Sequence, residues 1–335
     1  MMKFNIGHNI SKPWVYILST IAIVFWGLSY IWSGALLSMG IPVEYMVFVR
    51  ILIAALVLLA VNLLIGQNIK IKKKDLPSFL KLALLEPFVY FVAETYGIRF
   101  TGSPTISSLM IASSPIFSII VAMCVFKEKI TRLNIIGSLI CIAGIGMVTL
   151  TAGNVGSAFW LGMLLLLIAV LSEVGHASLT KVLSSGYSPS VIAMYQFLFG
   201  SVYLLPLFLT KGLSGFDASV YFSWEVIKPL LCLAILCSSL AFSLWANTIK
   251  HLGVGKSSVF LSTIPVCTAI AGWVLGHEYL TTLQWLGIVT ASLGVVLSQV
   301  VIRKPLFPKF KFHSGRRREG GNVGKNPMID SRVTV

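Results

Sequence analysis

Ten stretches of mostly apolar residues alternate with short polar or turn-forming segments along this chain. A transmembrane α-helix needs roughly 20 consecutive apolar residues, and each stretch is long enough to cross a bilayer. The third is the least regular, because Glu86 and Glu94 interrupt it. The predicted spans are 14–37, 44–65, 77–98, 104–126, 133–152, 158–180, 190–210, 228–249, 257–276 and 283–302. The pattern predicts an all-α integral membrane protein with ten transmembrane helices.

The composition supports this prediction and excludes a soluble globular chain. Hydrophobic residues make up 56% of the 335 residues and charged residues only 11%, against roughly a quarter charged in soluble domains. The net charge of +15 lies almost wholly in connecting segments and beyond residue 302, without a nucleic-acid-binding motif, so we expect no nucleic-acid partner. The five cysteines fall inside apolar runs and lack His or Cys partners at metal-ligand spacing. We expect no metal site and no cofactor.

The distribution of Lys and Arg predicts the orientation in the membrane. With an even number of spans, both termini lie on one side, and that side collects almost all the cations outside the spans. The opposite side collects only Arg99, Lys211 and Lys228. The positive-inside rule places the cation-rich side in the cytoplasm. We therefore expect a multi-pass protein of the cell (plasma or inner) membrane with both termini in the cytoplasm.

The two halves of the chain are related by a repeat. A shift of 146 residues relates the beginnings of the halves loosely, with Arg50 on Gln196, and a shift of 150 aligns their ends without a gap. Each half then holds five spans, and an odd number inserts the second copy upside down, as in inverted-repeat transporters. The pairs aligned by the larger shift include Ser107 with Ser257, Pro115 with Pro265, Glu128 with Glu278, Gly137 with Gly287 and Gly144 with Gly294.

The loop charges agree with two inverted copies. The segment 127–132 carries three cations and lies on the predicted cytoplasmic side, whereas its copy at 277–282 carries no Lys or Arg. One loop earlier the difference is reversed, because Phe100 corresponds to Lys250. Matched positions therefore carry cations only where the predicted topology puts them in the cytoplasm. A chance match between apolar sequences would not produce this exchange.

Taken together, these features resemble the drug/metabolite transporter superfamily, in its form with two EamA-type domains. The resemblance rests on Trp26-Gly27, on Arg50, and on the segment from Pro115 through Glu128 to Gly144 with its later copy. It covers residues 15–302. We expect a cytoplasmic N-terminus (1–13), a first five-helix repeat (14–152), a second five-helix repeat (153–302) and a disordered basic cytoplasmic tail (303–335).

The resemblance implies an inverted five-plus-five fold around a central cavity, lined mainly by spans 1, 3, 4, 6, 8 and 9. It also implies export or exchange of amino acids, nucleosides, drugs or other metabolites, or transport of nucleotide sugars. One departure from the family pattern concerns the cavity. The repeat counterpart of Trp26 is Ser172, which is followed by Glu173 where small or aromatic residues are commoner. The resemblance therefore says little about the chemistry of this cavity.

Ionisable side chains inside the predicted spans are the main candidates for function, because a charge in hydrocarbon is costly unless it faces a partner or water. Glu86 lies near the middle of the third span and Glu94 about two turns later, while Glu173 and His176 share one face of the sixth. These four residues are expected to bind a substrate amine or to take up a proton. The structural alternative is an interhelical hydrogen bond or ion pair. Arg50 is expected to pair with Glu44 or a lipid headgroup.

Two prolines at equivalent positions are predicted to interrupt the fourth and ninth spans. Pro115 follows Ser114, and Pro265 lies two residues after Thr263. A mid-helix proline frees a carbonyl and bends the helix, and matched interruptions are typical of transporter binding sites. We expect Ser114, Pro115, Thr263 and Pro265 to border the solute path. The nearby hydroxyls could instead bond back to their own helices.

These observations predict a secondary transporter for a small metabolite, with an amino acid or related amine or zwitterion as the first choice and export or exchange as the direction. A nucleotide-sugar or drug carrier, a channel or a lipid flippase of the same fold remain alternatives. The spans hold no Ser/His, Asp/Asp, Cys/His or His-Glu-x-x-His arrangement, so we expect no enzyme and no catalytic residue. The expected partners are the solute, membrane lipid and, as a further candidate, protons. The sequence is compatible with a homodimer.

Overall fold

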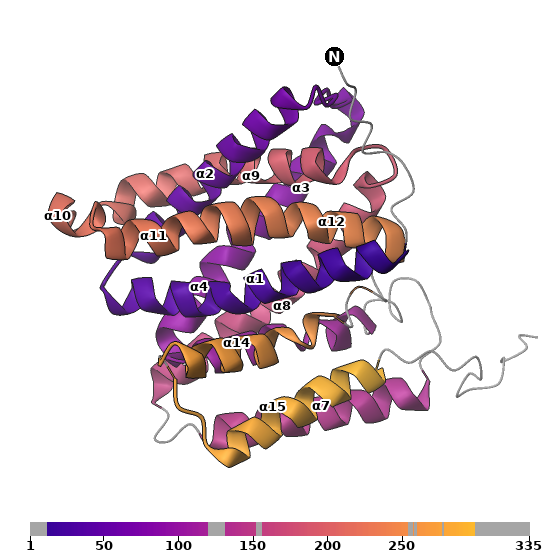
Figure 1. Ribbon diagram of the computed structural model, residues 1–335, viewed down its shortest axis with the longest axis vertical. Helices are drawn as coiled ribbons and strands as arrows, with labels where there is room; N and C mark the ends of the chain where they lie inside the picture. Colours follow the sequence, from indigo (N-terminus) through magenta and orange to yellow (C-terminus); the bar gives the residue numbers. More distant parts are fainter. Residues whose placement is uncertain are drawn as a thin grey trace, which may run out of the picture.

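The computed structural model describes residues 12–119, 131–151, 156–253, 257, 260–276 and 278–298, and every regular element in these ranges is a helix (Figure 1). The elements are α1 (Lys12–Ser38), α2 (Val43–Leu64), η1 (Lys73–Asp75), α3 (Leu76–Ala83), η2 (Leu84–Val89), α4 (Tyr90–Thr101), α5 (Pro104–Ile111), α7 (Arg132–Leu150), α8 (Ser157–Leu183), α9 (Pro189–Leu207), η3 (Phe208–Gly212), α10 (Ala218–Tyr221), α11 (Trp224–Cys232), η4 (Leu233–Leu240), α12 (Ala241–Leu252), α14 (Ile264–Val274) and α15 (Thr282–Ser298).

Several consecutive elements join into longer helices that match the predicted spans. Within the described residues, seven helices are long and apolar enough to cross a membrane: Pro13–Ser38, Val43–Leu64, Lys73–Thr101, Arg132–Leu150, Ser157–Leu183, Pro189–Gly212 and Trp224–Leu252. Three shorter apolar helices accompany them: Pro104–Ile119, Ile264–Val274 and Thr282–Ser298. Each predicted span overlaps one of these ten helices, which confirms the all-α membrane fold. Many large apolar side chains, such as Leu139 and Leu293, face outward, as they must in lipid.

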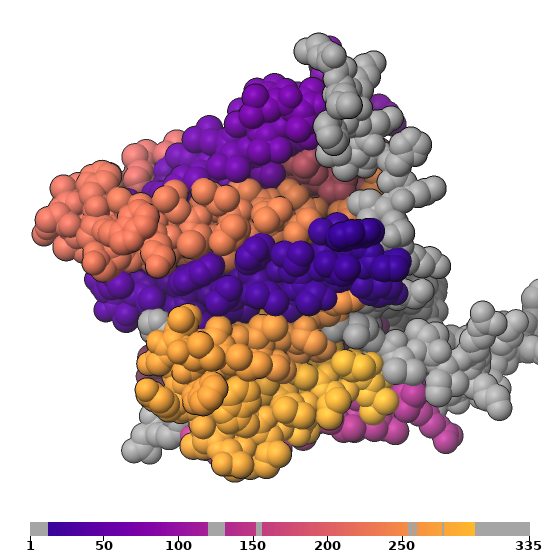
Figure 2. Space-filling model, in the orientation of Figure 1, coloured from indigo at the N-terminus to yellow at the C-terminus, as the bar shows by residue number. Residues whose placement is uncertain are grey.

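Segments that are far apart in sequence pack side by side. In Figure 1, α1 lies between α12 and α14, while α7 and α15 pair at one edge of the molecule. Figure 2 shows the same arrangement on the surface, where the indigo α1 separates the orange and yellow segments of the second repeat. Helices α4 and α8 and helices α2 and α9 form further contacts across the repeats. The interior is therefore shared by both halves of the chain.

The contact between α7 and α15 shows that the two copies are inverted. A Cβ atom built on Gly137 would lie 2.6 Å from the carbonyl oxygen of Gly294, and one built on Gly294 would lie 2.7 Å from that of Gly137. Gly144 and Gly287 face each other in the same way, at 2.6 and 2.9 Å. Residue numbers rise along α7 as they fall along α15, so these equivalent helices are antiparallel. A twofold relation between antiparallel spans requires an axis in the plane of the membrane.

Backbone irregularities recur at matched positions in the two repeats. The π-helical segments η2 and η4 interrupt the third and eighth spans. Within η2, Glu86 has an extended backbone (φ −143°, ψ 119°), because the ring of the following Pro87 disfavours helical geometry at the residue before it. In the fourth and ninth spans, turns at residues 112–113 and 262–263 immediately precede the restarted helices that carry Pro115 and Pro265. The predicted interruptions at these prolines are present.

The start of α5 is capped from the opposite repeat. Ser103 is the N-cap residue, and its side chain accepts a hydrogen bond from the backbone N–H of Ile106 at 3.1 Å. Glu278 lies against the same helix end, where it accepts from the Ser103 hydroxyl at 2.6 Å and from the backbone N–H of Thr105 at 3.2 Å. A carboxylate satisfies the free N–H groups and the positive end of the helix dipole. Glu278 therefore caps the start of α5, whereas its repeat counterpart Glu128 lies outside the described residues.

Candidate binding cavity between the repeats

A small buried cavity lies between the two repeats, at the level of the helix interruptions. Its volume is about 30 Å³, which suffices for a water molecule or two. The four predicted ionisable residues, Glu86, Glu94, Glu173 and His176, all line it. The remaining polar lining residues are Ser29, Tyr30, Arg50 and Tyr90, and the apolar and aromatic ones are Trp26, Phe91, Ile111, Phe242, Trp245, Leu261 and Ile264.

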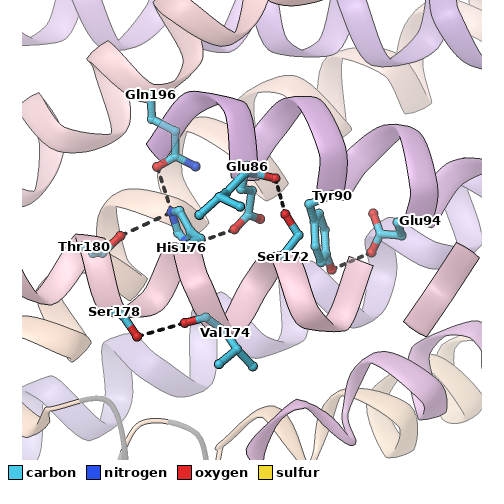
Figure 3. Close-up of polar contacts among 10 residues, drawn as sticks. Glu86, Tyr90, Glu94, Ser172, Val174, His176, Ser178, Thr180 and Gln196 are labelled. Atoms are coloured by element: carbon cyan, nitrogen blue, oxygen red, sulfur yellow. Dashed lines mark hydrogen bonds and ion pairs between the residues drawn. The ribbon is translucent and has the colours of Figure 1, made fainter. Parts of the chain in front are cut away.

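Glu86 and His176 form an ion pair in this cavity (Figure 3). The Glu86 Oε2 atom lies 2.8 Å from Nδ1 of His176, and both side chains are 4% exposed. Glu86 comes from the extended break in η2, while His176 comes from the middle of α8. The break turns the Glu86 side chain toward α8 because its backbone does not follow the helical path. The interhelical pairing that the sequence allowed for these residues is present.

The other ring nitrogen of His176 also meets polar groups. Its Nε2 atom lies 3.0 Å from the amide oxygen of Gln196 on α9 and 3.3 Å from the Thr180 hydroxyl on α8. Gln196 is 2% exposed, and its Nε2 atom has no hydrogen-bond partner among the described residues. A buried amide nitrogen without a partner is costly and uncommon. Both ring nitrogens of His176 therefore have polar partners, whereas the amide nitrogen of Gln196 has none among the described residues.

Glu94 belongs to a second polar group at the cavity. It accepts a hydrogen bond from the Tyr90 hydroxyl at 2.8 Å (Figure 3), and Tyr30 of α1 interacts with both residues. Arg50 lies close enough to act electrostatically on Glu94. All four side chains are less than a tenth exposed. Two phenolic O–H groups and one cation therefore surround this carboxyl, which stabilises its charge.

Arg50 is held by partners that differ from those expected. Its Nε atom donates to the Ser238 hydroxyl at 2.7 Å, and its guanidinium carbon lies 4.2 Å from the centre of the Phe91 ring. The Glu44 carboxyl instead accepts from the Tyr96 hydroxyl at 2.5 Å. With 2% of its surface exposed, Arg50 is buried beside the cavity. The expected pairing with Glu44 or a lipid headgroup is therefore wrong.

Glu173 connects the sixth span to the broken fourth span. Its carboxyl interacts with the side chain of Ser114, the residue at which the fourth span becomes helical again. Glu173 is more exposed than Glu86 or Glu94. Glu173 is therefore the one partly exposed carboxyl among the three that line the cavity. Ser114, which directly precedes Pro115, borders the site through this contact.

The residues that the ninth span contributes to the cavity are not the predicted ones. Its cavity residues are Leu261 and Ile264, whereas the predicted Thr263 is exposed and donates to the carbonyl oxygen of Phe260 in its own helix. Pro265 is buried next to this turn but does not line the cavity. Other hydroxyls near the two prolines, those of Ser107, Ser108, Ser113 and Ser257, also donate to carbonyls of their own segments.

Aromatic residues form one wall of the cavity. The Trp26 ring packs edge-on against Phe242 and Trp245, with centroid distances of 5.1 and 5.2 Å. Its Nε1 atom donates to the carbonyl oxygen of Cys237 in η4 at 3.0 Å. Sequence reasoning did not select Phe242 and Trp245 as site residues, because aromatic residues are frequent in apolar spans. What distinguishes Phe242 and Trp245 from other aromatic residues in the spans is that they lie shortly after the end of η4.

Two polar residues that the sequence reasoning passed over carry a signal in the repeat: Tyr30, which lines the cavity, and Gln196, which contacts the cavity residue His176. Tyr30 is the counterpart of His176, and Gln196 is the counterpart of Arg50. Each matched pair therefore places polar side chains at the same interface in both halves. Comparing polar positions between the copies, rather than ionisable ones alone, would have found them.

A membrane protein with an inverted duplication and a buried polar cavity between its halves has the organisation of a secondary transporter. Comparison with known proteins agrees: the EamA-like transporter family matches this chain twice, over residues 13–150 and 160–299. The chain belongs to the EamA-like transporter family.

Several relatives cover most of the chain. The uncharacterized transporter YetK of Bacillus subtilis (strain 168) is 28% identical over 280 residues, which are 81% of this chain and 83% of the relative. A probable terminal-alkyne amino-acid exporter of Streptantibioticus cattleyicolor is 27% identical over 256 residues, 76% of this chain and 80% of the relative. An uncharacterized transporter of Archaeoglobus fulgidus is 27% identical over 296 residues, 88% of this chain and 99% of the relative.

The fold is also similar to a solved structure. A crystal structure described only as that of a protein aligns with a TM-score of 0.64 at 14% sequence identity, and the alignment covers 86% of this chain and 97% of the other. At this identity the similarity concerns the fold alone.

Proposed function

We propose that this protein is a secondary carrier that exports or exchanges a neutral amino acid with an apolar side chain across the cell membrane. The observation that carries the proposal is the cavity itself. It combines three carboxyls, one arginine and an aromatic wall in a single buried space between the repeats. These are the groups that an ammonium, a carboxylate and an apolar side chain respectively require.

The charges of the cavity favour a zwitterion over an anion. A substrate ammonium group would bind the carboxyl of Glu173 or Glu86, and the substrate carboxylate would bind Arg50, whose planar guanidinium suits a carboxylate. Arg50 is the sole Arg or Lys of the described cavity lining. A sugar phosphate or nucleotide sugar calls for several cations, and the excess of carboxyls opposes it. The amino-acid exporter among the relatives supports the same substrate class.

Aromatic and aliphatic groups would receive the side chain of the solute. Trp26, Phe242 and Trp245 present ring faces and edges to the cavity, and Leu261 and Ile264 close it from the ninth span. Binding sites for small molecules commonly combine such apolar walls with a few oriented polar groups. A neutral amino acid needs polar partners only for its ammonium and carboxylate groups, which Glu173 or Glu86 and Arg50 would supply.

Loading requires the cavity to enlarge. A volume of about 30 Å³ holds a water molecule or two, whereas an amino acid is several times larger. The interruptions at η2, η4 and the two proline breaks surround the cavity, and they are the places where the helical hydrogen-bond ladder is already broken. Movement of the flanking helices at these points would open the cavity to one side at a time, as alternating access requires.

The proposal includes a location and an orientation. The cation-rich loops support an orientation with both termini in the cytoplasm and a location in the plasma or inner membrane. We assign no catalytic residue and no cofactor, because binding and a change of conformation account for the proposed activity. A dimer would place two independent cavities side by side.

The test is transport by the purified protein in liposomes. Vesicles loaded with unlabelled solute are screened for counterflow of labelled amino acids, nucleosides and amines at two pH values. We expect saturable counterflow of neutral amino acids, with a loss of about tenfold or more in Glu173→Gln. The exposed Glu225→Gln, at the start of α11, is the matched control and keeps wild-type counterflow.

Three results would contradict the proposal. Equal transport by wild-type, Glu86→Gln and Glu173→Gln proteins would remove the carboxyls from the mechanism. Counterflow of a sugar phosphate or nucleotide sugar would change the substrate class. Non-saturable flux, or movement of fluorescent lipid between leaflets without amino-acid counterflow, would identify a channel or a lipid flippase instead.

A further inference from the structure

Both ring nitrogens of His176 face oxygen acceptors. Nδ1 lies 2.8 Å from the Glu86 carboxylate oxygen, and Nε2 lies 3.0 Å from the amide oxygen of Gln196. A carboxylate oxygen and an amide oxygen can only accept, while a neutral imidazole carries a single N–H. With the Gln196 amide oxygen facing the ring, the contacts match an imidazolium that donates one N–H to each partner. In this arrangement the positive charge of His176 neutralises Glu86.

Gln196 also provides for the deprotonated ring. Its unpartnered Nε2 atom can exchange places with the oxygen by rotation of the side-chain amide, and it then donates to a ring nitrogen that has lost its proton. The hydroxyl of Thr180, 3.3 Å from the same nitrogen, can donate or accept. The surroundings of His176 are thus equipped for two protonation states, and the change between them needs only one amide rotation.

Few other charges act on this histidine. Among the described residues, the charged groups that act on it are Glu86 from η2 and Glu173 from its own helix. Helix α9 contributes the neutral Gln196, and α12 contributes the Phe242 ring at 6.3 Å. Glu173 in turn interacts with the side chain of Ser114 in the fourth span. Among the described residues, His176 is the group that forms an ion pair with Glu86.

We propose that a proton on His176 and the ammonium group of the solute compete for the Glu86 carboxylate, so that the carrier exchanges its solute for H⁺. The inference rests on the proposed function and adds the coupling ion and its binding site. Two cations cannot share one buried carboxylate within ~4 Å of each other without strong repulsion. Occupation by one therefore expels the other.

The cycle balances in protons and solute. With the cavity open to the cytoplasm, the solute ammonium binds Glu86 and the proton of His176 leaves to cytoplasmic water. With the cavity open to the outside, a proton from external water binds His176, which regains Glu86, and the solute departs. One proton enters for each solute molecule that leaves. An acidic exterior consequently drives export.

The experiment measures solute and proton movement in the same liposomes. Wild-type protein is reconstituted with a pH-sensitive dye inside, and labelled L-leucine and L-phenylalanine serve as probes. We expect an outward amino-acid gradient to acidify the lumen. His176→Asn keeps an amide that can donate to Glu86 but cannot carry a proton. In this variant the number of protons moved per transported solute molecule is expected to fall about tenfold or more. Its exchange rate also becomes insensitive to pH.

Ser178→Ala is the matched control. Ser178 lies on α8 two residues from His176, but its hydroxyl donates to the Val174 carbonyl at 3.0 Å and does not reach the cavity (Figure 3). This variant should keep the wild-type ratio of protons to solute. Unchanged coupling in His176→Asn would overturn the proposal.

The wild-type measurement decides the matter even where a variant fails to fold. Amino-acid counterflow without any proton movement would overturn the coupling proposal and leave the proposed function standing. Absence of counterflow for every amino acid tested would instead refute the proposed function.

Discussion

Trp26 and Ser172 occupy equivalent positions in the two repeats, and each donates a hydrogen bond to the interrupted helix of the other repeat. Trp26 donates from Nε1 to the carbonyl oxygen of Cys237 in η4 at 3.0 Å, and Ser172 donates from its hydroxyl to that of Leu85 in η2 at 2.7 Å. Helical irregularities release carbonyls that need new partners. The side chains differ, yet both stabilise the same kind of break.

Removing either donor should destabilise the protein by a similar amount. Trp26→Phe and Ser172→Ala each leave a buried carbonyl oxygen without this partner, at a cost of about 1–3 kcal/mol. We expect a clear fall in the midpoint of thermal unfolding in detergent for each variant. The effects should add in the double variant, because the two contacts share no residue.

A matched hydroxyl deletion serves as the control for Ser172→Ala. Thr20→Val removes an exposed hydroxyl on α1 whose partner is the Tyr16 carbonyl of the same helix, and it should leave the unfolding midpoint within about a degree. A strongly non-additive double variant would show that the two interruptions do not act independently.

The glycine seam between α7 and α15 should tolerate no side chain. In Gly144→Ala the new Cβ atom would lie 2.6 Å from the Gly287 carbonyl oxygen, and such overpacking costs roughly 1–3 kcal/mol. We expect a lower unfolding midpoint and a reduced yield of folded protein. Gly146→Ala, two residues further along α7, meets nothing within 4 Å. It should be neutral or slightly stabilising because alanine favours helix, and equal losses in both variants would contradict the packing argument.

The hydroxyls around Glu94 should be needed for transport. Tyr90→Phe removes the donor 2.8 Å from the Glu94 carboxyl, and loss of a hydrogen bond to a charged group costs about 1.5–3 kcal/mol. We expect about a tenfold or greater loss in the ratio of maximal counterflow rate to half-saturating concentration. Tyr16→Phe changes an exposed tyrosine that packs on Phe260 and should transport normally. Normal transport by Tyr90→Phe would make the contact dispensable.

Loss of the Glu278 cap should loosen the start of α5. Glu278→Gln keeps the size of the side chain but removes the charge that faces the helix N-terminus, and such charge-assisted contacts contribute about 1–2 kcal/mol. We expect a lower unfolding midpoint and faster thiol labelling of a cysteine introduced at the neighbouring, partly exposed Thr101. Labelling at the same rate in both backgrounds would show that Glu278 does not hold this end closed.

The orientation can be tested without transport. A fluorescent protein that matures only in the cytoplasm, fused after Val335, should fluoresce, whereas a fusion within the segment between η3 and α10 should not. A dark C-terminal fusion would reverse the predicted topology and the direction assigned to each face of the cavity.

Much of the fold could be predicted because its causes are local in sequence. Span length, loop cations and the matched Pro115 and Pro265 depend on residue type and spacing alone, and they fixed the spans and the interruptions. The four ionisable residues converge on one cavity because a charge buried in a membrane protein is costly unless it lies beside polar or oppositely charged groups. This requirement acts on any sequence with the same pattern.

The partners within the cavity could not be predicted, because they depend on distances across the bundle. The extended backbone at Glu86 turns its side chain toward His176, and Arg50 selects Ser238 over Glu44 although Glu44 is closer in sequence. Thr263 lies on the outer side of a turn whose rotation the sequence leaves open. Such choices follow from tertiary packing and not from periodicity.

The seam of Gly137, Gly144, Gly287 and Gly294 is self-complementary, since each half presents the same surface to the other. A single five-helix copy would therefore bury this surface equally well against a second copy inserted in the opposite direction. Joining the copies in one chain removes the need for a polypeptide to enter the membrane in both directions. Each half then becomes free to diverge, so that Glu173 and His176 can arise in one copy while Gly27 and Tyr30 stand in the other.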